Sequence, residues 1–301
     1  HLLKSFMDKI EFIAEVSSNH NRDINRMKEF IYASKEVGCT GVKFQLFKID
    51  ELFSPEILAK SETHRKRKEW ELPIKYIPEL ADLSHSLGLS FSCTPFYLEA
   101  VDILEPYIDF YKIASYELLW IDLFEKCGNT GKPIVFSTGM ATLDEVETTL
   151  NCLIATETKD ITVLHCNSAY PTPIKDANLA GIKSLKKMIE TMDNQNQIEI
   201  KVGYSDHTVS PAVIYRATHQ YNVDFVEFHL DLDGKGEEYK AGHCWLPDQI
   251  SEVIANLNLG LEADGQEIFE PSISELPDRG WRADPVDGLR PMKIIRENFG
   301  R

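Results

Sequence analysis

The architecture follows most directly from residues 198–230, which read IEIKVGYSDHTVSPAVIYRATHQYNVDFVEFHL. Two apolar runs in this stretch, Ile198–Gly203 and Asp224–Phe228, are as continuous as strands buried on both faces of a parallel sheet. The segment between them reads as a helix. The two predicted strands end in polar segments, Ser205-Asp206-His207 and Glu227-Phe228-His229. The stretch therefore predicts a strand–helix–strand unit of an α/β fold.

The same alternation of apolar run and helical segment recurs along the chain until eight strands are counted. Eight such units favour a closed (β/α)8 barrel, the TIM barrel, over an open doubly wound sheet. No GxGxxG or GxxxxGK(S/T) sequence supports the open-sheet, nucleotide-binding alternative. The other six predicted strands are Phe12–Val16, Gly41–Leu46, Leu89–Cys93, Phe110–Ala114, Pro133–Phe136 and Ile161–Cys166.

The chain is predicted to hold one domain and a tail. Residues 1–265 are expected to form a single TIM-barrel catalytic domain. Residues 142–145, TLDE, have the pattern of a capping box that opens the fifth helix, and Pro247 to Gly260 supplies the eighth. Two long excursions, Phe47–Leu72 and Asp231–Leu246, interrupt the rhythm. Residues 266–301 are irregular and rich in Arg and Pro, and we expect this tail to pack on the barrel or on a partner subunit.

Composition limits the possible functions. The formal charge of −16 argues against binding to nucleic acid or to an anionic membrane. No apolar run approaches the roughly 18 residues that a membrane span requires. Six scattered cysteines without a CxxC spacing predict free thiols and a cytoplasmic location. If the ligand is an anion, such an acidic chain must concentrate its few cations at the site.

Cations and hydroxyl groups follow several strands, at the carboxyl ends where barrel enzymes place their chemistry. Lys43 and Lys112 lie on the second and fourth predicted strands, and a buried ammonium needs a negative partner. A ligand with a phosphate and a carboxylate would satisfy both lysines. The alternative is a structural ion pair of each lysine with Glu15 or Glu117. The hydroxyl groups that could join the lysines belong to Thr94, Ser115, Ser137 and Ser205.

Two histidines, His207 and His229, end neighbouring strands. Adjacent strands lie about 4.8 Å apart, so both imidazoles can reach one divalent metal ion. Two neutral nitrogens leave positions open for water or substrate, which suits a Lewis acid better than a structural zinc. A lone histidine would more often be a hydrogen-bonded wall residue, whereas this pair predicts a metal site.

A third group of side chains suits a polyhydroxylated substrate. Glu15 or Glu117 could move a proton if its surroundings tune its pKa, or could only neutralise a lysine. The residues expected to contact such a substrate are Gln45, Ser168, Tyr170 and Asp206, together with these two acids.

An ordered set of motifs between about residues 10 and 245 resembles the sialic acid synthase family. Each motif is weak alone, but the order of the whole set is specific. The motifs are EVSSNH (15–20), VKFQ (42–45), CTPF (93–96), YKIASYE (111–117), STGM (137–140), LHC (164–166), YP (170–171), GYSDH (203–207) and EFH (227–229).

The resemblance implies a transferase that condenses phosphoenolpyruvate with the open-chain aldehyde of an N-acetylated hexosamine. The products would be phosphate and a nonulosonic acid, a nine-carbon 2-keto acid of the sialic acid type. It further implies that His207 and His229 bind manganese, with magnesium or cobalt as alternatives, and that the enzyme is a homodimer. By resemblance the phosphoenolpyruvate contacts are Lys43, Thr94, Lys112, Ser115, Ser137 and Ser205, and the contacts to the sugar or the attacking water are Glu15, Gln45, Glu117 and Tyr170.

The chain also departs from the family pattern. Family members usually carry a small antifreeze-like domain whose arginine reaches the sugar of a partner subunit, and a short form without it is expected here. We hypothesise that Arg282 or Arg290 replaces that arginine, in the same chain or across a dimer, although simple packing of the tail is the alternative. The family's glycines after the first strand are Ser17 and Arg22 here.

The segment after the eighth strand differs as well. Where family members have Gly-Pro-Asp-His, this chain reads Ala241-Gly242-His243, followed by Cys244 and Trp245. The acceptor sugar therefore stays open among precursors of sialic, legionaminic, pseudaminic and related acids. Two rival functions are a Schiff-base aldolase with Lys112 as the nucleophile, which needs no metal, and a non-catalytic sugar-binding barrel.

Overall fold

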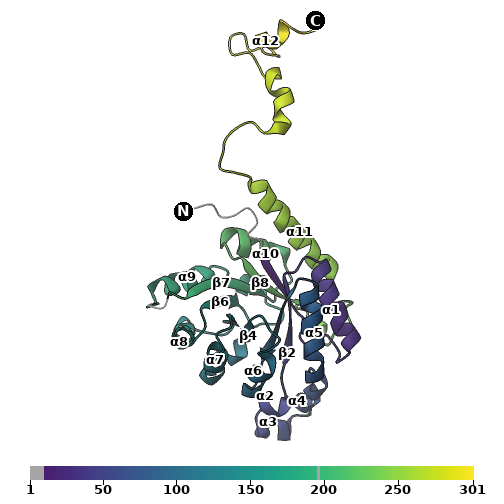
Figure 1. Cartoon of the computed structure of the whole chain (residues 1–301), viewed down its shortest axis with the longest axis vertical. Coiled ribbons are helices and arrows are strands. Elements are labelled where there is room, and N and C mark those ends of the chain that lie inside the picture. The colour runs from purple at the N-terminus through teal and green to yellow at the C-terminus, as the bar shows by residue number, and fades with distance from the viewer. Residues whose placement is uncertain (1–9, 195–196) are drawn as a thin grey trace. The chain divides into compact units, whose positions relative to one another are not determined.

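The structure, a computed structural model, describes residues 10–194 and 197–301. Within these residues, eight parallel strands form a ring with helices on its outside (Figure 1). The strands are hydrogen-bonded in the order β3-β2-β1-β8-β7-β6-β5-β4, and a parallel bridge between Ser92 and Phe110 closes the ring. The predicted (β/α)8 barrel is confirmed. The strands are β1 (Glu11–Glu15), β2 (Gly41–Leu46), β3 (Ser90–Pro95), β4 (Tyr111–Ile113), β5 (Ile134–Ser137), β6 (Asp160–Cys166), β7 (Glu199–Asp206) and β8 (Phe225–Leu230).

Each predicted strand is found, displaced by at most a few residues at either end. A two-residue strand, β9 (Cys244–Trp245), was not predicted; it pairs with β8 and brings the segment after β8 back onto the barrel. Aromatic side chains fill the layer between strands and helices, as in the edge-to-face pair of Phe124 and Phe136. These side chains are fully buried because strands and helices cover them from both sides.

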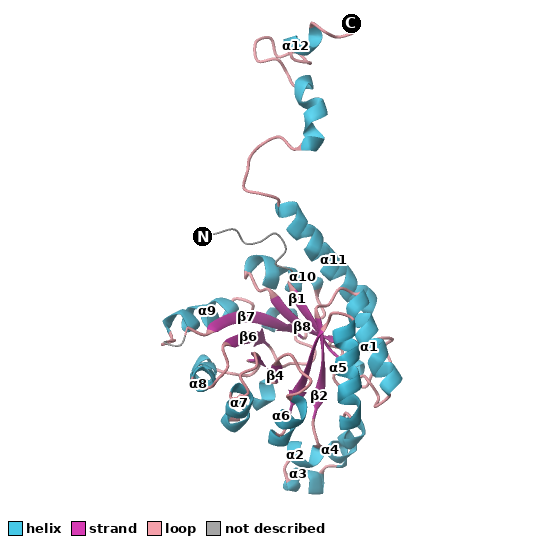
Figure 2. Cartoon of the chain, in the orientation of Figure 1, coloured by secondary structure: helices cyan, strands magenta, loops and turns pink. Residues whose placement is uncertain are grey.

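Helices follow the strands as predicted, and the excursion at Phe47–Leu72 consists of short helices rather than irregular loop (Figure 2). The capping residue Thr142 accepts a hydrogen bond from the backbone N–H of Glu145, so the fifth predicted helix begins where the sequence indicated. The α-helices are α1 (Ile24–Glu36), α2 (Ile49–Leu52), α3 (Pro55–Lys60), α4 (Glu62–Lys66), α5 (Ile77–Ser86), α6 (Leu98–Leu104), α7 (Ile121–Gly128), α8 (Leu143–Ile154), α9 (Gly181–Thr191), α10 (Pro211–Tyr215), α11 (Pro247–Asp264) and α12 (Lys293–Arg296).

Shorter helical turns complete the connections. They are the 3₁₀ turns η1 (Arg67–Trp70), η2 (Ile74–Tyr76), η3 (Ser115–Glu117), η4 (Ile174–Asp176), η6 (Tyr239–Ala241) and η7 (Ile273–Trp281), and the π turn η5 (Arg216–Gln220). No helix of the described residues is long and apolar enough to cross a membrane. All six cysteines are free thiols, as predicted.

The residues that replace the family's glycines adopt a backbone conformation that favours glycine. Ser17 has φ = 52° and Arg22 has φ = 57°, both in the left-handed region. A side chain at such a position costs about 1–2 kcal/mol. The loop after β1 therefore keeps the conformation expected for glycine despite the different residues.

Residues 260–301 form a second compact unit. Ser272 and Glu275 make a reciprocal capping box at the start of η7. The backbone N–H of Met292 donates to the carbonyl of Gly280 (3.0 Å), which ties α12 to η7 within this unit. The tail is thus more ordered internally than its composition predicted. Its packing on the barrel or on a partner stays a prediction.

Candidate active site

A cavity at the carboxyl ends of the strands contains both predicted groups, the lysines and the histidines. If the lysines and the histidines act on one ligand, they must line the same cavity, and they do. The cavity is lined by Glu15, Lys43, Gln45, Lys112, Ala114, Ser115, Ser137, Cys166, Tyr170, Ser205, His207, Glu227 and His229.

Strand register places Glu15 at the centre of this site. Its Cα lies level with Lys43 on β2 and with His229 on β8, so it adjoins both the cationic and the imidazole parts. The Glu15 carboxylate is ion-paired with the Lys43 ammonium and accepts a hydrogen bond from the side-chain amide of Gln45. Lys43 also donates to the Thr94 hydroxyl (3.2 Å). All of these groups except Gln45 are buried.

The second lysine pairs with a carboxylate that the sequence reasoning missed. Lys112 Nζ lies 3.3 Å from Glu227 Oε2, and Lys43 Nζ lies 4.0 Å from the same oxygen. The Ser205 hydroxyl donates to Glu227 Oε1 (3.4 Å). The ion-pair alternative is therefore correct for Lys43 but wrong about the partner of Lys112, which is not Glu117. Glu227 precedes His229 by two residues on one strand, and this same-face spacing was a signal in the sequence.

Burial and ion pairing shift the pKa values of these four ionisable groups in different directions. Burial raises the pKa of Glu15 to about 7, although the neighbouring Lys43 opposes the rise. Burial also disfavours ionised Glu227, but Lys112 and Lys43 outweigh it and lower the pKa of Glu227. The pKa of Lys43 is raised because Glu15 and Glu227 outweigh burial. The pKa of Lys112 is lowered, mainly by burial. Glu15 is thus the acid of this group that can hold a proton near neutral pH.

Glu117 lies on η3 and is not among the residues that line the cavity. Burial raises its pKa to about 7, against the attraction of Lys112. Its Oε2 atom is buried and has no hydrogen-bond partner among the described residues. Like Glu15, Glu117 has the raised pKa that a proton-transfer group near pH 7 requires.

The predicted hydroxyl groups differ in what they bind. The Ser115 hydroxyl accepts a hydrogen bond from the backbone N–H of Gly139 (3.0 Å). The Ser137 hydroxyl is buried and has no partner within the described part of the chain. An orphaned buried hydroxyl in a cavity lined by lysines is an available donor for an anionic ligand. Ser168 approaches Gly139 so closely that a Cβ at residue 139 would overlap its hydroxyl.

The rings of the two predicted metal-binding histidines lie edge to face with centroids 5.0 Å apart, and Tyr170 packs on His207 with centroids 4.4 Å apart. His207 Nδ1 lies 2.6 Å from the carbonyl oxygen of Asn167, and His229 Nδ1 lies 2.9 Å from Glu238 Oε2. In each ring, Nδ1 therefore lies within hydrogen-bond distance of an acceptor, and Nε2 is the nitrogen available to a metal ion. This is the usual arrangement of metal-ligating histidines, and the residues fit a metal ion.

The ionisation of the two rings differs. Burial lowers the pKa of His229 to about 4, so this ring is neutral near pH 7 and able to bind a metal. The pKa of His207 is raised to about 9 because the adjacent Cys166 outweighs burial. A metal ion bound at His207 would therefore displace a proton.

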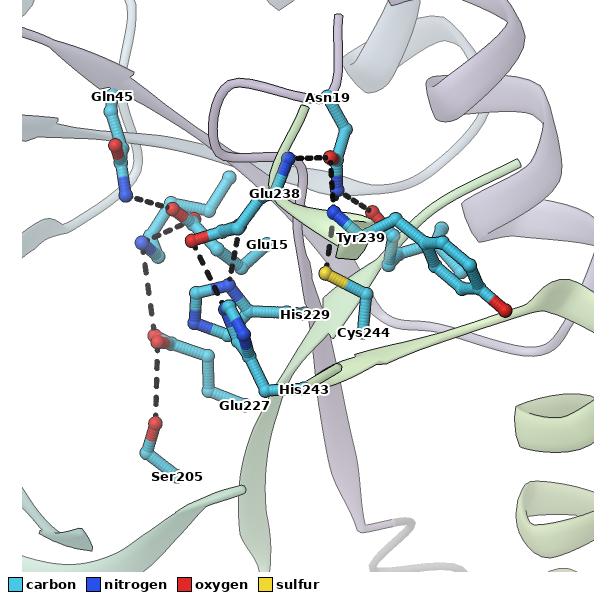
Figure 3. Close-up of polar contacts among 12 residues, drawn as sticks. Glu15, Asn19, Gln45, Ser205, Glu227, His229, Glu238, Tyr239, His243 and Cys244 are labelled. Carbon is cyan, nitrogen blue, oxygen red and sulfur yellow. Dashed lines mark hydrogen bonds and ion pairs between the residues drawn. The ribbon is translucent and has the colours of Figure 1, made fainter. Parts of the chain in front are cut away.

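The segment after β8 is fixed to the barrel by buried polar contacts. The side-chain oxygen of Asn19 accepts hydrogen bonds from the backbone N–H groups of Glu238 (2.8 Å) and Tyr239 (3.2 Å), and its amide nitrogen donates to the Leu230 carbonyl (3.0 Å) (Figure 3). Gly236 passes so close to Asn19 that a Cβ there would overlap its side chain. These contacts place the Glu238 carboxylate beside His229.

A third histidine, His243, also belongs to this cluster and was not predicted as a site residue. Its ring centroid lies 4.7 Å from that of His229 and 5.8 Å from that of His207. Its Nε2 atom lies 3.1 Å from Glu238 Oε1. The fourteen-residue separation from His229 has no helical or strand periodicity, so the sequence carried no signal that these residues meet.

The predicted substrate contacts of the barrel that do not line the cavity are Thr94, Ser168 and Asp206. Asp206 is fully buried, and its two carboxylate oxygens accept hydrogen bonds from five donors, including the Trp245 indole (2.9 Å). We therefore interpret Asp206 as a residue that positions the segment after β7. Arg282 and Arg290 are exposed residues of the second unit, where Arg282 donates to the Arg279 carbonyl. Their role at the sugar stays a prediction.

Comparisons with known proteins agree with this architecture. An uncharacterised protein of Methanocaldococcus jannaschii, MJ1065, is 35% identical over 266 residues, covering 86% of this chain and 74% of that protein. The pseudaminic acid synthase of Helicobacter pylori is 32% identical, covering 74% and 66%, and the N,N'-diacetyllegionaminic acid synthase of Campylobacter jejuni is 32% identical, covering 89% and 81%.

A solved structure, the N-acetylneuraminic acid synthetase of Leptospira borgpetersenii in complex with citrate, superposes with a TM-score of 0.76 at 25% identity and covers 90% of each chain. The named relatives are synthases, which confirms the prediction of a synthase-type enzyme. Residues 30–268 match the NeuB family. The chain therefore belongs to the NeuB family, the sialic acid synthase family that its ordered motifs predicted.

Proposed function

We propose that this chain condenses phosphoenolpyruvate with the open-chain aldehyde of an N-acetylated hexosamine to give a nonulosonic acid and phosphate. C3 of phosphoenolpyruvate bonds to the aldehyde carbon, whose oxygen takes up a proton. Water adds to C2, and the C2 carbon–oxygen bond to phosphate breaks. The observation that carries the proposal is the single cavity lined by two buried lysines and by two histidines able to hold a metal.

The lysines supply the anion-binding half. Lys43 and Lys112 have carboxylate partners already, so a phosphate or carboxylate of the ligand would exchange with Glu15 and Glu227. The unpartnered hydroxyl of Ser137 is a further donor. Charge-assisted hydrogen bonds of this kind are shorter and stronger than neutral ones, which favours a doubly anionic substrate.

Glu15 adjoins both halves of the site, and its raised pKa suits a proton donor. A protonated Glu15 can give its proton to the aldehyde oxygen as the carbon–carbon bond forms. A divalent metal held by His207 and His229 would polarise that carbonyl. Manganese is the proposed ion, with magnesium or cobalt as alternatives.

The relatives named for legionaminic and pseudaminic acids support a 2,4-diacetamido hexose as the acceptor over simple N-acetylmannosamine. The test offers phosphoenolpyruvate, Mn²⁺ and a panel of 2-acetamido and 2,4-diacetamido hexoses to the full chain. Phosphate release and the mass of the keto acid are measured. Lys112→Met should abolish release, whereas the exposed His219→Ala should not. Failure to release phosphate with every sugar of the panel would refute the proposal.

One observation favours a second candidate, the Schiff-base aldolase. The buried Lys112 has a lowered pKa, as a nucleophilic lysine requires. Borohydride in the presence of pyruvate would then trap a covalent adduct on Lys112, detectable by mass spectrometry. A chelator distinguishes the two candidates, because it should stop the metal-assisted condensation and leave the aldolase active.

A further inference from the structure

We propose that His243 and Glu238 complete, with His229, a metal site of two histidines and one carboxylate. The inference rests on the metal-assisted form of the proposed function and extends it beyond the pair of His207 and His229. Both added residues lie on the segment after β8, which β9 and Asn19 hold against the barrel.

The donor atoms converge. One ligand atom from each of His229, Glu238, His243 and Cys244 lies within 4.8 Å of all the others. Glu238 Oε2 is 2.9 Å from His229 Nδ1, and Oε1 is 3.1 Å from His243 Nε2. Figure 3 shows the Glu238 carboxylate directed at both rings. Two ligand atoms that each lie about 2.0–2.1 Å from one ion, and subtend an angle there between 90° and the tetrahedral value, are separated by roughly these two distances.

His243 supplies an independent observation. Its side chain is 2% exposed, and neither ring nitrogen makes a hydrogen bond of acceptable geometry with the described residues, although Nε2 lies close to Glu238. A buried polar ring without hydrogen bonds is unfavourable in a protein that binds nothing there. Coordination of an ion would use a nitrogen that otherwise has no function.

Cys244 is not required in this set. The Asn19 amide nitrogen lies 3.5 Å from its sulfur, so Cys244 contacts the residue that anchors the segment. Two imidazoles and one carboxylate form a set that leaves several positions open. Imidazole ligands suit first-row transition metals, for which affinity rises from Mn²⁺ through Fe²⁺ to Co²⁺, whereas magnesium prefers oxygen ligands. We therefore expect cobalt to bind more tightly than magnesium.

Metal titration of the full chain without substrates tests the site. The chain is stripped with a chelator and titrated with Co²⁺, followed by visible absorption, and with Mn²⁺, followed by the electron paramagnetic resonance of the free ion. His243→Ala and Glu238→Gln should each weaken binding by roughly 10- to 100-fold. The exposed His219→Ala is the matched control and should bind as the wild type does. Unchanged affinity of His243→Ala for both ions would overturn the proposal.

Two further arms guard against a trivial loss of folding. Circular dichroism of each stripped variant must match the wild type before its affinity is compared. His243→Cys keeps a ligand atom, so it should recover part of the affinity and add a thiolate-to-cobalt band to the spectrum; absence of both would contradict direct coordination. Because no substrate is present, failure of the condensation assay alone would remove the proposed function and leave the metal site standing.

Discussion

Glu117→Gln should change the pH dependence of stability in a calculable way. The buried Glu117 carboxyl has a pKa raised from 4.5 to about 7. Between these values the native state holds a proton that the unfolded chain has released, so stability falls as pH rises through this window. One pKa unit corresponds to about 1.4 kcal/mol, so the full effect is about 3 kcal/mol. The glutamine variant is always neutral and lacks this loss.

Urea unfolding of both proteins at pH 5 and pH 8 measures the effect. At pH 5 the wild type has lost only a small part of the 3 kcal/mol, and at pH 8 nearly all of it. The free energy of unfolding of Glu117→Gln, relative to the wild type, should therefore rise by about 2–3 kcal/mol between the two pH values. The exposed Glu36→Gln on α1 is the control and should differ by less than about 0.5 kcal/mol. Parallel pH profiles for Glu117→Gln and the wild type would show that Glu117 is not held neutral by burial.

Three other substitutions test separate parts of the structure. Arg22→Gly should stabilise the protein by about 0.5–1 kcal/mol in urea unfolding, because residue 22 has a left-handed φ, and a loss of stability would contradict this. Asn19→Ala should cost about 2–4 kcal/mol in the same assay, since it leaves the backbone N–H groups of Glu238 and Tyr239 without their acceptor. Lys112→Met should weaken phosphoenolpyruvate binding, measured by calorimetry, by at least about tenfold, and undiminished affinity would remove Lys112 from the anion site.

The fold was predictable because parallel strands buried on both faces have a distinct composition. The eight strands are mostly buried, and polar side chains at the carboxyl ends of most of them line one cavity. The short strand β9 escaped prediction because its two residues, Cys244 and Trp245, are too few to show a period. Its pairing with β8 is a tertiary feature that local sequence does not encode.

The site was predictable in its residue types but only in part in its pairings. Lys43 and Glu15 are in contact because their strands are adjacent and their Cα atoms are paired in the register. To predict this contact, one must know the register. Lys112 reaches across to Glu227 on β8, whereas Glu117, nearer in sequence, lies on η3 and has no ion pair with Lys112 within 4.0 Å. Spacing along the chain says nothing about contacts across a closed barrel. For the same reason, the sequence did not predict that Glu238 and His243 lie beside His229.

The arrangement of charges is compatible with the proposed binding of an anion by so acidic a chain. With both glutamates ionised and both lysines protonated, the charges of Glu15, Glu227, Lys43 and Lys112 sum to zero. Protonation of Glu15, whose pKa is about 7, leaves one positive charge. An entering anion would raise that pKa further through like-charge repulsion. Under the proposed condensation, anion entry and proton uptake would therefore be coupled, and the proton on Glu15 would be the one given to the aldehyde oxygen.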